Sequence, residues 1–190
     1  MLEKEPDTMA TNTYCEYTKN LDEENVHKIY HDTQYGFPID SDNELFGRLI
    51  LEINQAGLSW DTILKKQENF RKAYSNFDIK TIANYDENER ARLLSDAGII
   101  RNKLKVNAAI HNANVILELQ KEHGSFQNWL DAHHPKTKDE WVKLFKKTFK
   151  FTGGEITNEF LMSSGYLKGS HSESCHIYKK ILKTNPKWNQ

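Results

Sequence analysis

Apolar residues recur every three or four positions along most of this chain, which is the spacing of one face of an α-helix. The alternation typical of β-strands is weak, because the β-branched residues occur singly. Helix start and stop signals divide the pattern into segments. The predicted helices cover residues 42–56, 60–77, 79–85, 87–94 and 102–122, followed by a capped turn at 126–130, a helix that begins after Thr137 and a last one that ends at Gly165. The sequence therefore predicts an all-α fold.

The predicted helix 42–56 places a carboxylate among apolar residues. At 100° per residue, Glu52 falls on nearly one line with Leu45, Leu49 and Ala56, so we expect its side chain to point toward the core. A buried carboxylate needs hydrogen-bond donors, a cation or a ligand that supplies one of these. Two structural interpretations stay open, because the Glu52 side chain could instead extend into water or pair with Arg48.

Local signals place an aromatic residue beside that carboxylate. Ser41 and Glu44 have the spacing of a capping box at the start of the helix. Gly57 is a typical residue at a helix end, and Ser59 can cap the next helix, whose first turn carries Trp60. We expect the Glu52 carboxylate and the indole to be neighbours across a tight corner, which is the outline of a binding pocket.

Composition and charge bound the class of protein. The chain has 190 residues, of which 37% are hydrophobic, so it fits a single domain over 1–190, with residues 1–13 and 184–190 expected to be flexible tails. It shows no apolar run long enough to span a membrane and no signal-peptide core, so we expect a cytoplasmic protein without membrane contact. Residues 1–60 carry a net charge of −8 and residues 61–190 one of +7, which permits a nucleic-acid face without requiring one. No sequence feature resembles an interface stripe, so we expect a monomer.

The segment 93–105 joins two predicted helices through Gly98 and leads into a basic first turn. This arrangement resembles a helix-hairpin-helix element, in which backbone amides hold a DNA phosphate without reading sequence. Gly98, Arg101, Lys103 and Lys105 are the candidate DNA contacts. Glycine-linked helix pairs are common, so the segment alone leaves a structural interpretation open.

Cysteine and histidine near the two ends of the chain raise the question of a metal. His171 and Cys175 are four residues apart, which presents both side chains together, and Cys15 and His31 could complete a four-ligand zinc site that ties the ends of the chain to each other. His176 is the nearest competing ligand. Such a spacing also arises by chance, so spacing alone does not decide for zinc.

Four runs of residues together resemble DNA-3-methyladenine glycosylase I, in the same order from about Cys15 to Cys175: residues 30–38 (YHDTQYGFP), 51–64 (LEINQAGLSWDTIL), 97–102 (AGIIRN) and 171–175 (HSESC). The resemblance implies an all-helical fold of the helix-hairpin-helix glycosylase superfamily, in which a flipped methylated base is cut from damaged double-stranded DNA. It implies one structural Zn²⁺ held by Cys15, His31, His171 and Cys175. It also maps base-pocket residues onto Glu52, Tyr30 and Trp60, with Tyr35 and Tyr17 at flanking aromatic positions.

The implied chemistry is the hydrolytic release of 3-methyladenine in base excision repair. Alkylation at N3 makes adenine cationic, so the base departs neutral without a strong general acid. Ionised Glu52 would accept hydrogen bonds from the exocyclic amine and stabilise the cation, Trp60 and Tyr35 would stack on the ring, and water would be the nucleophile. No lysine suggests Schiff-base chemistry, so strand nicking is not expected.

The chain departs from the family pattern at several positions. Members commonly carry tryptophan where Tyr35 and Tyr17 stand, an acidic residue at Gln34, glycine at Ile53 and an aromatic residue or glutamine at Asn54. These changes bear on the shape and selectivity of the pocket. If the selectivity is unusual, Ile53 and Asn54 are the first positions at which we would look for the cause. Two rival functions follow: a protein of the same fold that binds alkylated bases or DNA with weak or no turnover, and a zinc-stapled interaction domain without DNA contact.

Overall fold

The structure is a computed structural model that describes residues 13–190, and within them it contains helices and connecting loops but no strand. The predicted tail at 1–13 therefore lies almost wholly outside the described residues. The helices in chain order are α1 (Tyr14–Lys19), α2 (Val26–Thr33), α3 (Asp42–Gln55), α4 (Trp60–Ala73), η1 (Ser75–Phe77), α5 (Ile79–Ala83), α6 (Glu87–Ser95), α7 (Lys103–His123), α8 (Phe126–His133), α9 (Lys138–Thr148), α10 (Gly154–Ser163), α11 (Tyr178–Lys183) and η2 (Lys187–Asn189). The all-α prediction is confirmed. No helix in the part described is long and apolar enough to cross a membrane.

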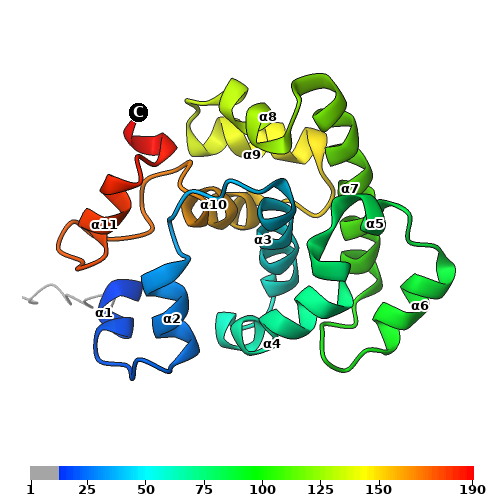
Figure 1. Cartoon of the computed structure of the whole chain (residues 1–190), viewed down its shortest axis with the longest axis horizontal. Coiled ribbons are helices and arrows are strands. Elements are labelled where there is room, and N and C mark those ends of the chain that lie inside the picture. The colour runs from blue at the N-terminus through cyan, green and yellow to red at the C-terminus, as the bar shows by residue number, and fades with distance from the viewer. Residues whose placement is uncertain (1–12) are drawn as a thin grey trace, which may run out of the picture.

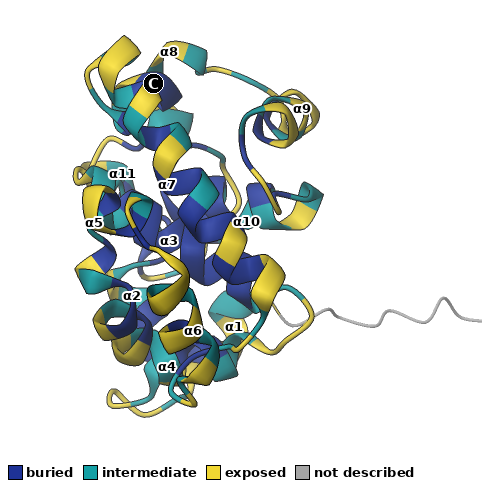
Figure 2. Cartoon of the chain, turned by 90° about the vertical axis from the view of Figure 1, so that its right-hand side faces the viewer, coloured by how far each residue is buried: buried dark blue, intermediate teal, exposed yellow. Residues whose placement is uncertain are grey.

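Helix α3 lies at the centre of the molecule, with α10 beside it and the other helices around them (Figure 1). Every residue of α3 from Leu45 to Asn54 is buried, and Figure 2 shows its ribbon in the colour of buried residues. Asp42 at the first turn of α3 also holds a distant helix, because its carboxylate accepts the backbone N–H groups of Phe126 and Gln127 at 2.7 and 3.0 Å. The central helix thus fixes the start of α8 as well as the core.

The predicted caps of α3 are confirmed in part. The Ser41 hydroxyl accepts the N–H of Glu44 at 3.4 Å, as expected of an N-cap. The Glu44 carboxylate does not return to the cap, because it forms a two-pronged pair with Arg71 of α4, with both N···O distances at 2.7 Å. At the other end Gly57 adopts φ +81°, a left-handed conformation that side chains rarely adopt, and the chain turns sharply there into α4.

Helices α1 and α2 lie on the same side of the molecule as the C-terminal segment that contains α11 (Figure 1). Backbone and side-chain contacts hold them: the N–H of Gly36 donates to the carbonyl of Ser163 at 2.9 Å, and His171 contacts the carbonyl of Tyr35 at 2.8 Å. Residues 184–190, which the sequence suggested to be a tail, include η2, and the backbone N–H of Trp188 donates to the carbonyl of Gly165 at 3.2 Å.

Candidate functional site

A cavity of about 410 Å³ opens at the corner between α3 and α4. Its lining comes from α1, α2, α3, α4, α10 and the segment after α2, so residues from both ends of the chain build it. The lining residues are Tyr14, Tyr30, Tyr35, Glu52, Gln55, Trp60, Glu155 and Glu159. The structure therefore brings together four of the residues that the sequence suggested for a base pocket, namely Glu52, Tyr30, Trp60 and Tyr35.

Glu52 lies at the deep end of this cavity and is only 4% exposed. Among the described residues its carboxylate has no hydrogen-bond or ion-pair partner, so it neither reaches bulk water nor pairs with Arg48. The Arg48 Nη1 donates instead to the Tyr30 hydroxyl at 3.0 Å and to the carbonyl of Ser163 at 3.4 Å. Glu52 is thus a buried acceptor that faces a cavity and requires donors or a positive charge from a ligand.

Burial sets the protonation state of this carboxyl. Loss of solvation raises the pKa of Glu52 to about 8, nearby Arg48 opposes this, and the negative charge of Glu159 adds to it. With this pKa, Glu52 is mostly protonated at neutral pH, which differs from the ionised carboxylate expected from the sequence. A cation in the cavity would lower its pKa and favour ionisation.

Aromatic rings form the walls around Glu52. The ring centroid of Tyr30 lies 5.2 Å from that of Trp60, in an edge-to-face arrangement, and 5.6 Å from that of Tyr35. Tyr17 lies outside the cavity: its side chain is largely exposed and stacks on Tyr14, which lines the cavity in its place. Flat π-surfaces beside a carboxylate suit a planar, positively charged ligand.

Sequence reasoning missed four lining residues, Tyr14, Gln55, Glu155 and Glu159. Glu155 and Glu159 stand one turn apart on α10, whose neighbouring positions Thr157, Phe160 and Leu161 are buried. A carboxylate beside buried positions on a short helix was the available signal, and it is the same signal that drew attention to Glu52. What the sequence could not supply is that α10 packs on α3 and faces the same cavity.

The positions that depart from the family pattern fall in different places. Ile53 is buried in the hydrophobic core, and Asn54 donates its side-chain amide to the carbonyl of Ile50 at 2.8 Å. Neither lines the cavity, so the structure does not support the expectation that unusual selectivity arises there. Tyr35, by contrast, lines the cavity, and its hydroxyl donates a hydrogen bond to the Glu159 carboxylate at 3.1 Å.

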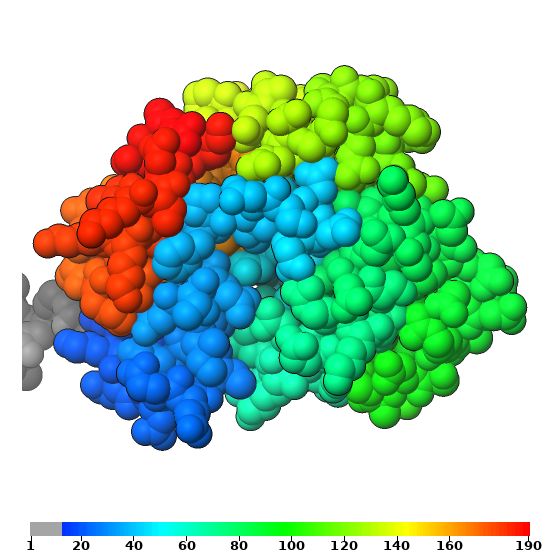
Figure 3. Space-filling model, in the orientation of Figure 1, coloured from blue at the N-terminus to red at the C-terminus, as the bar shows by residue number. Residues whose placement is uncertain are grey.

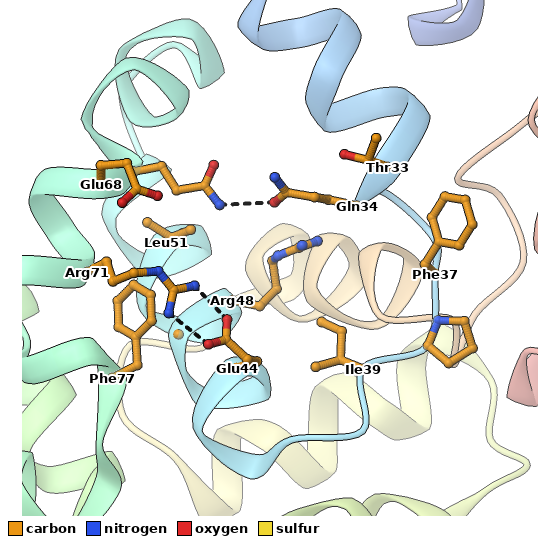
Figure 4. A pocket seen from close by; sticks show the side chains of 13 residues that line it. Thr33, Gln34, Phe37, Ile39, Glu44, Arg48, Leu51, Glu68, Arg71 and Phe77 are labelled. Atoms are coloured by element: carbon orange, nitrogen blue, oxygen red, sulfur yellow. Dashed lines mark hydrogen bonds and ion pairs between the residues drawn. The ribbon is translucent and has the colours of Figure 1, made fainter.

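Gln34 lines a second cavity, of about 340 Å³, on another side of α3. Its side-chain oxygen accepts a hydrogen bond from Gln67 at 2.9 Å, and the close-up shows Arg48 entering the same space and Arg71 paired with Glu44 (Figure 4). In the space-filling view this face is hollowed between residues 33–39 and α4 (Figure 3). The departure at Gln34 therefore does not alter the lining of the first cavity.

A cluster of potential metal ligands joins the two ends of the chain. The ligand atoms of Cys15, His31, His171 and Cys175 all lie within 4.8 Å of one another, which is the residue set that the sequence suggested. The Cys175 Sγ lies 3.7 Å from His31 Nε2 and 3.4 Å from His171 Nδ1. This cluster could hold a metal ion. His176 is not part of it and instead lies 3.2 Å from the Asp32 carboxylate.

The hydrogen bonds behind the two histidines fit a metal site. His31 Nδ1 lies 2.6 Å from Asp32 Oδ1, and His171 Nε2 lies 2.8 Å from the carbonyl of Tyr35. In each ring the nitrogen that faces away from the cluster is occupied by an acceptor, which leaves the inward nitrogen as a lone-pair donor to a metal. Burial also lowers the pKa of His171 to about 4, which keeps its imidazole neutral, as ligation requires.

The segment expected to contact DNA connects α6 and α7. Gly98 donates its N–H to the Asp96 carboxylate at 2.7 Å, and a side chain at Gly98 would collide with that carboxylate, so this amide is already used within the turn. Arg101 and Lys103 are exposed. Lys105 is buried and donates from its Nζ to the carbonyls of Asn54 and Ala56 at 2.8 and 2.7 Å. Lys105 thus caps the end of α3, and its position does not fit the expected contact with DNA.

Comparison with known proteins identifies the family to which this chain is similar. The model of the methyladenine glycosylase family matches residues 20–143. DNA-3-methyladenine glycosylase 1 of Escherichia coli (strain K12) is 34% identical over 168 residues, which cover 78% of this chain and 89% of the relative. DNA-3-methyladenine glycosylase of Haemophilus influenzae is 32% identical over 171 residues, covering 80% and 92%.

Solved structures show the same fold. A crystal structure of 3-methyladenine DNA glycosylase I matches with a TM-score of 0.73 at 32% identity and covers 82% of this chain and 96% of its own. A variant of 3-methyladenine DNA glycosylase I in complex with 3-methyladenine matches with a TM-score of 0.74 at 27% identity, covering 82% and 94%.

Proposed function

The chain belongs to the methyladenine glycosylase family, and we propose that it is a DNA glycosylase that excises 3-methyladenine from alkylated DNA. The observation that carries this function is the buried Glu52 carboxylate, which faces a 410 Å³ cavity walled by Tyr30, Tyr35 and Trp60. A cavity of this size holds a planar base that has been flipped out of the duplex. Similar proteins are named for the same reaction, and one of them is described in complex with 3-methyladenine.

The site favours a positively charged base. Alkylation at N3 places a positive charge on adenine, and that charge meets the Glu52 carboxylate while the ring stacks against Trp60 and Tyr35. Arrival of the cation lowers the pKa of Glu52 from about 8, so the carboxyl ionises as the base binds. A neutral adenine gains neither the ionic attraction nor the ionised acceptor.

Bond cleavage then needs little further help from the protein. The glycosidic bond of a cationic base is already weak, the base leaves as a neutral molecule, and the positive charge develops on the sugar. Ionised Glu52 stabilises this charge electrostatically, and a water molecule adds to the sugar and releases a proton to solvent. Arg48, through its hydrogen bond to the Tyr30 hydroxyl, keeps that ring in place beside Glu52.

We also propose that the Cys15, His31, His171 and Cys175 cluster holds a structural zinc ion. Two sulfur and two imidazole ligands are a typical zinc set, and the acceptors behind both histidines support it. When bound, the ion would tie α1 and α2 to the segment before α11. Because Tyr14 and Tyr35 lie next to His31 and His171, with ring centroids at 5.6 Å in each pair, the same ion would stiffen the aromatic wall.

Double-stranded DNA is the proposed partner, and α6 with α7 the proposed helix-hairpin-helix. Arg101 and Lys103 at the start of α7 are exposed and would contact phosphates. In a binding assay, the affinity for a duplex should fall with salt, and Lys103→Ala should reduce that salt dependence. Lys121→Ala, in the last turn of the same helix, is the matched control and should leave the slope unchanged.

The direct test of the function is the release of free base. Purified protein is incubated with methylated DNA, and the released bases are identified by chromatography against standards. We expect 3-methyladenine from the wild type and a loss of about 10- to 100-fold for Trp60→Ala, the range for removing one stacked aromatic ring. No release by folded protein at high concentration would instead favour a base-binding protein without turnover.

A further inference from the structure

A second carboxylate lines the base pocket at intermediate depth. Glu52 at the bottom is 4% exposed, Glu159 on α10 is partly buried, and the Glu155 side chain, one turn away on α10, is 82% exposed. All three line the same cavity. Glu159 is therefore intermediate in exposure between Glu155 and Glu52 along the lining of one cavity.

The Glu159 carboxylate is held in place by one of its oxygens. The Tyr35 hydroxyl donates to Oε2 at 3.1 Å, and Tyr35 is itself anchored through its carbonyl to His171. Oε1 accepts no hydrogen bond from the residues that the structure describes, and the side chain borders the cavity. One oxygen is thus fixed by the protein, and the other is free to contact a ligand.

A purely structural role does not explain the charge of Glu159. An amide oxygen at this position would also accept a hydrogen bond from the Tyr35 hydroxyl, whereas a carboxylate in addition repels Glu52 and Glu155 and loses solvation. The charged groups that face it are Glu52 on α3, Glu155 on its own helix and Lys138 on α9, and Lys138 is paired with Glu155 at 3.0 Å. The negative charge of Glu159 raises the pKa of Glu52, and a cation in the cavity would relieve this repulsion.

We propose that Glu159 is a second recognition carboxylate of the base pocket, which selects purines carrying a fixed positive charge over neutral purines. This inference rests on the proposed function, because it assumes that the cavity receives the flipped base. It extends that function by assigning the recognition of this charge to a second carboxylate, on a different helix from Glu52. The positively charged ring would lie between Glu52 at its inner edge and Glu159 at the side.

The test compares a cationic and a neutral free base of nearly the same shape. The dissociation constants of 3,9-dimethyladeninium and 9-methyladenine are measured by calorimetry at pH 8 for the wild type, Glu159→Gln and Glu159→Ser. Glu118→Gln, an exposed site on α7, is the control for a change of net charge. We expect the preference for the cation to fall by about tenfold in both Glu159 variants, as for one partly screened charge, and to stay unchanged in the control.

The outcomes separate recognition from a structural role. Weaker binding of the cation alone supports the proposal, whereas equal weakening of both bases, or an unchanged ratio in either folded variant, overturns it. Base release from methylated DNA by the wild type is measured alongside. If the wild type releases no 3-methyladenine, the proposed function fails; if it does and the binding ratio is unaffected by Glu159, only this inference fails.

Discussion

Replacing Glu52 with glutamine should make the protein more stable at alkaline pH, even though it removes the principal group of the pocket. Glu52 is buried without a partner among the described residues, and its pKa is raised to about 8 from an ordinary value of 4.5. The folded state therefore keeps a proton that the unfolded chain releases above pH 4.5. Because the folded state binds more protons, its free energy of unfolding falls as pH rises from about 4.5 to about 8 and is level beyond that.

The size of the effect follows from the shift in pKa. A difference of about 3.5 units at 1.36 kcal/mol per unit gives a penalty of about 5 kcal/mol once pH exceeds the folded-state pKa. Between pH 5 and pH 8 the wild type should lose about 3.5 kcal/mol relative to Glu52→Gln, whose amide does not titrate. All other titrating groups are common to both proteins, so their contributions largely cancel in the difference.

Urea unfolding of the two proteins, followed by circular dichroism at half-unit steps from pH 5 to pH 9, measures this difference. Glu118→Gln, whose carboxylate is exposed, is the control and should stay parallel to the wild type over the whole range. A difference between Glu52→Gln and wild type that is flat with pH would refute the argument, because it would mean that Glu52 is ionised in the folded protein at no cost.

Three further predictions test other parts of the site. The kcat/KM for base release should rise with pH up to about pH 8, where Glu52 of the free enzyme ionises. In Glu52→Gln this rise should be absent. A wild-type kcat/KM that does not change with pH would contradict the role of Glu52. Lys105→Met should lower the free energy of unfolding by about 2 kcal/mol, since it leaves the carbonyls of Asn54 and Ala56 without a donor. The same variant should leave the salt dependence of DNA binding unchanged. A weaker salt dependence would mean that Lys105 contacts DNA. Metal analysis of the purified protein should give one zinc per chain, and a stoichiometry near zero in untreated folded protein would rule out the zinc site. Removal of the metal by a chelator should lower the melting temperature and weaken the binding of 3,9-dimethyladeninium.

The long helices could be predicted because their signals are local. Ser59 and Thr137 each cap a helix in the structure as their positions suggested. Asp78, Asp86 and Ser125 likewise cap the helices that follow them, and Gly124 ends α7. The helices α1, α2 and α11, of six, eight and six residues, were not predicted. Their position depends on contacts between the ends of the chain, which no local pattern contains.

The site was predictable where one motif carries it and obscure where distant segments meet. Glu52 and Trp60 lie on either side of a single turn, so their proximity follows from the sequence. Glu159 joins them only because α10 packs on α3, and Tyr14 takes the place expected for Tyr17 because the direction of a ring on a short helix depends on its neighbours. The position of Lys105 could not be predicted for a similar reason: its side chain turns inward to donate to two carbonyls at the end of α3, a distant segment of the chain.

The rate of 3-methyladenine release by Glu52→Gln relative to wild type, measured at pH 8 with enzyme in excess over methylated DNA, tests the central claim most directly. We predict that the variant, folded and still able to bind duplex DNA, releases the base about 10² to 10³ times more slowly, the usual loss for removing one group that stabilises a developing charge. Release at the wild-type rate would contradict the assignment of this buried carboxylate as the group that recognises the cationic base.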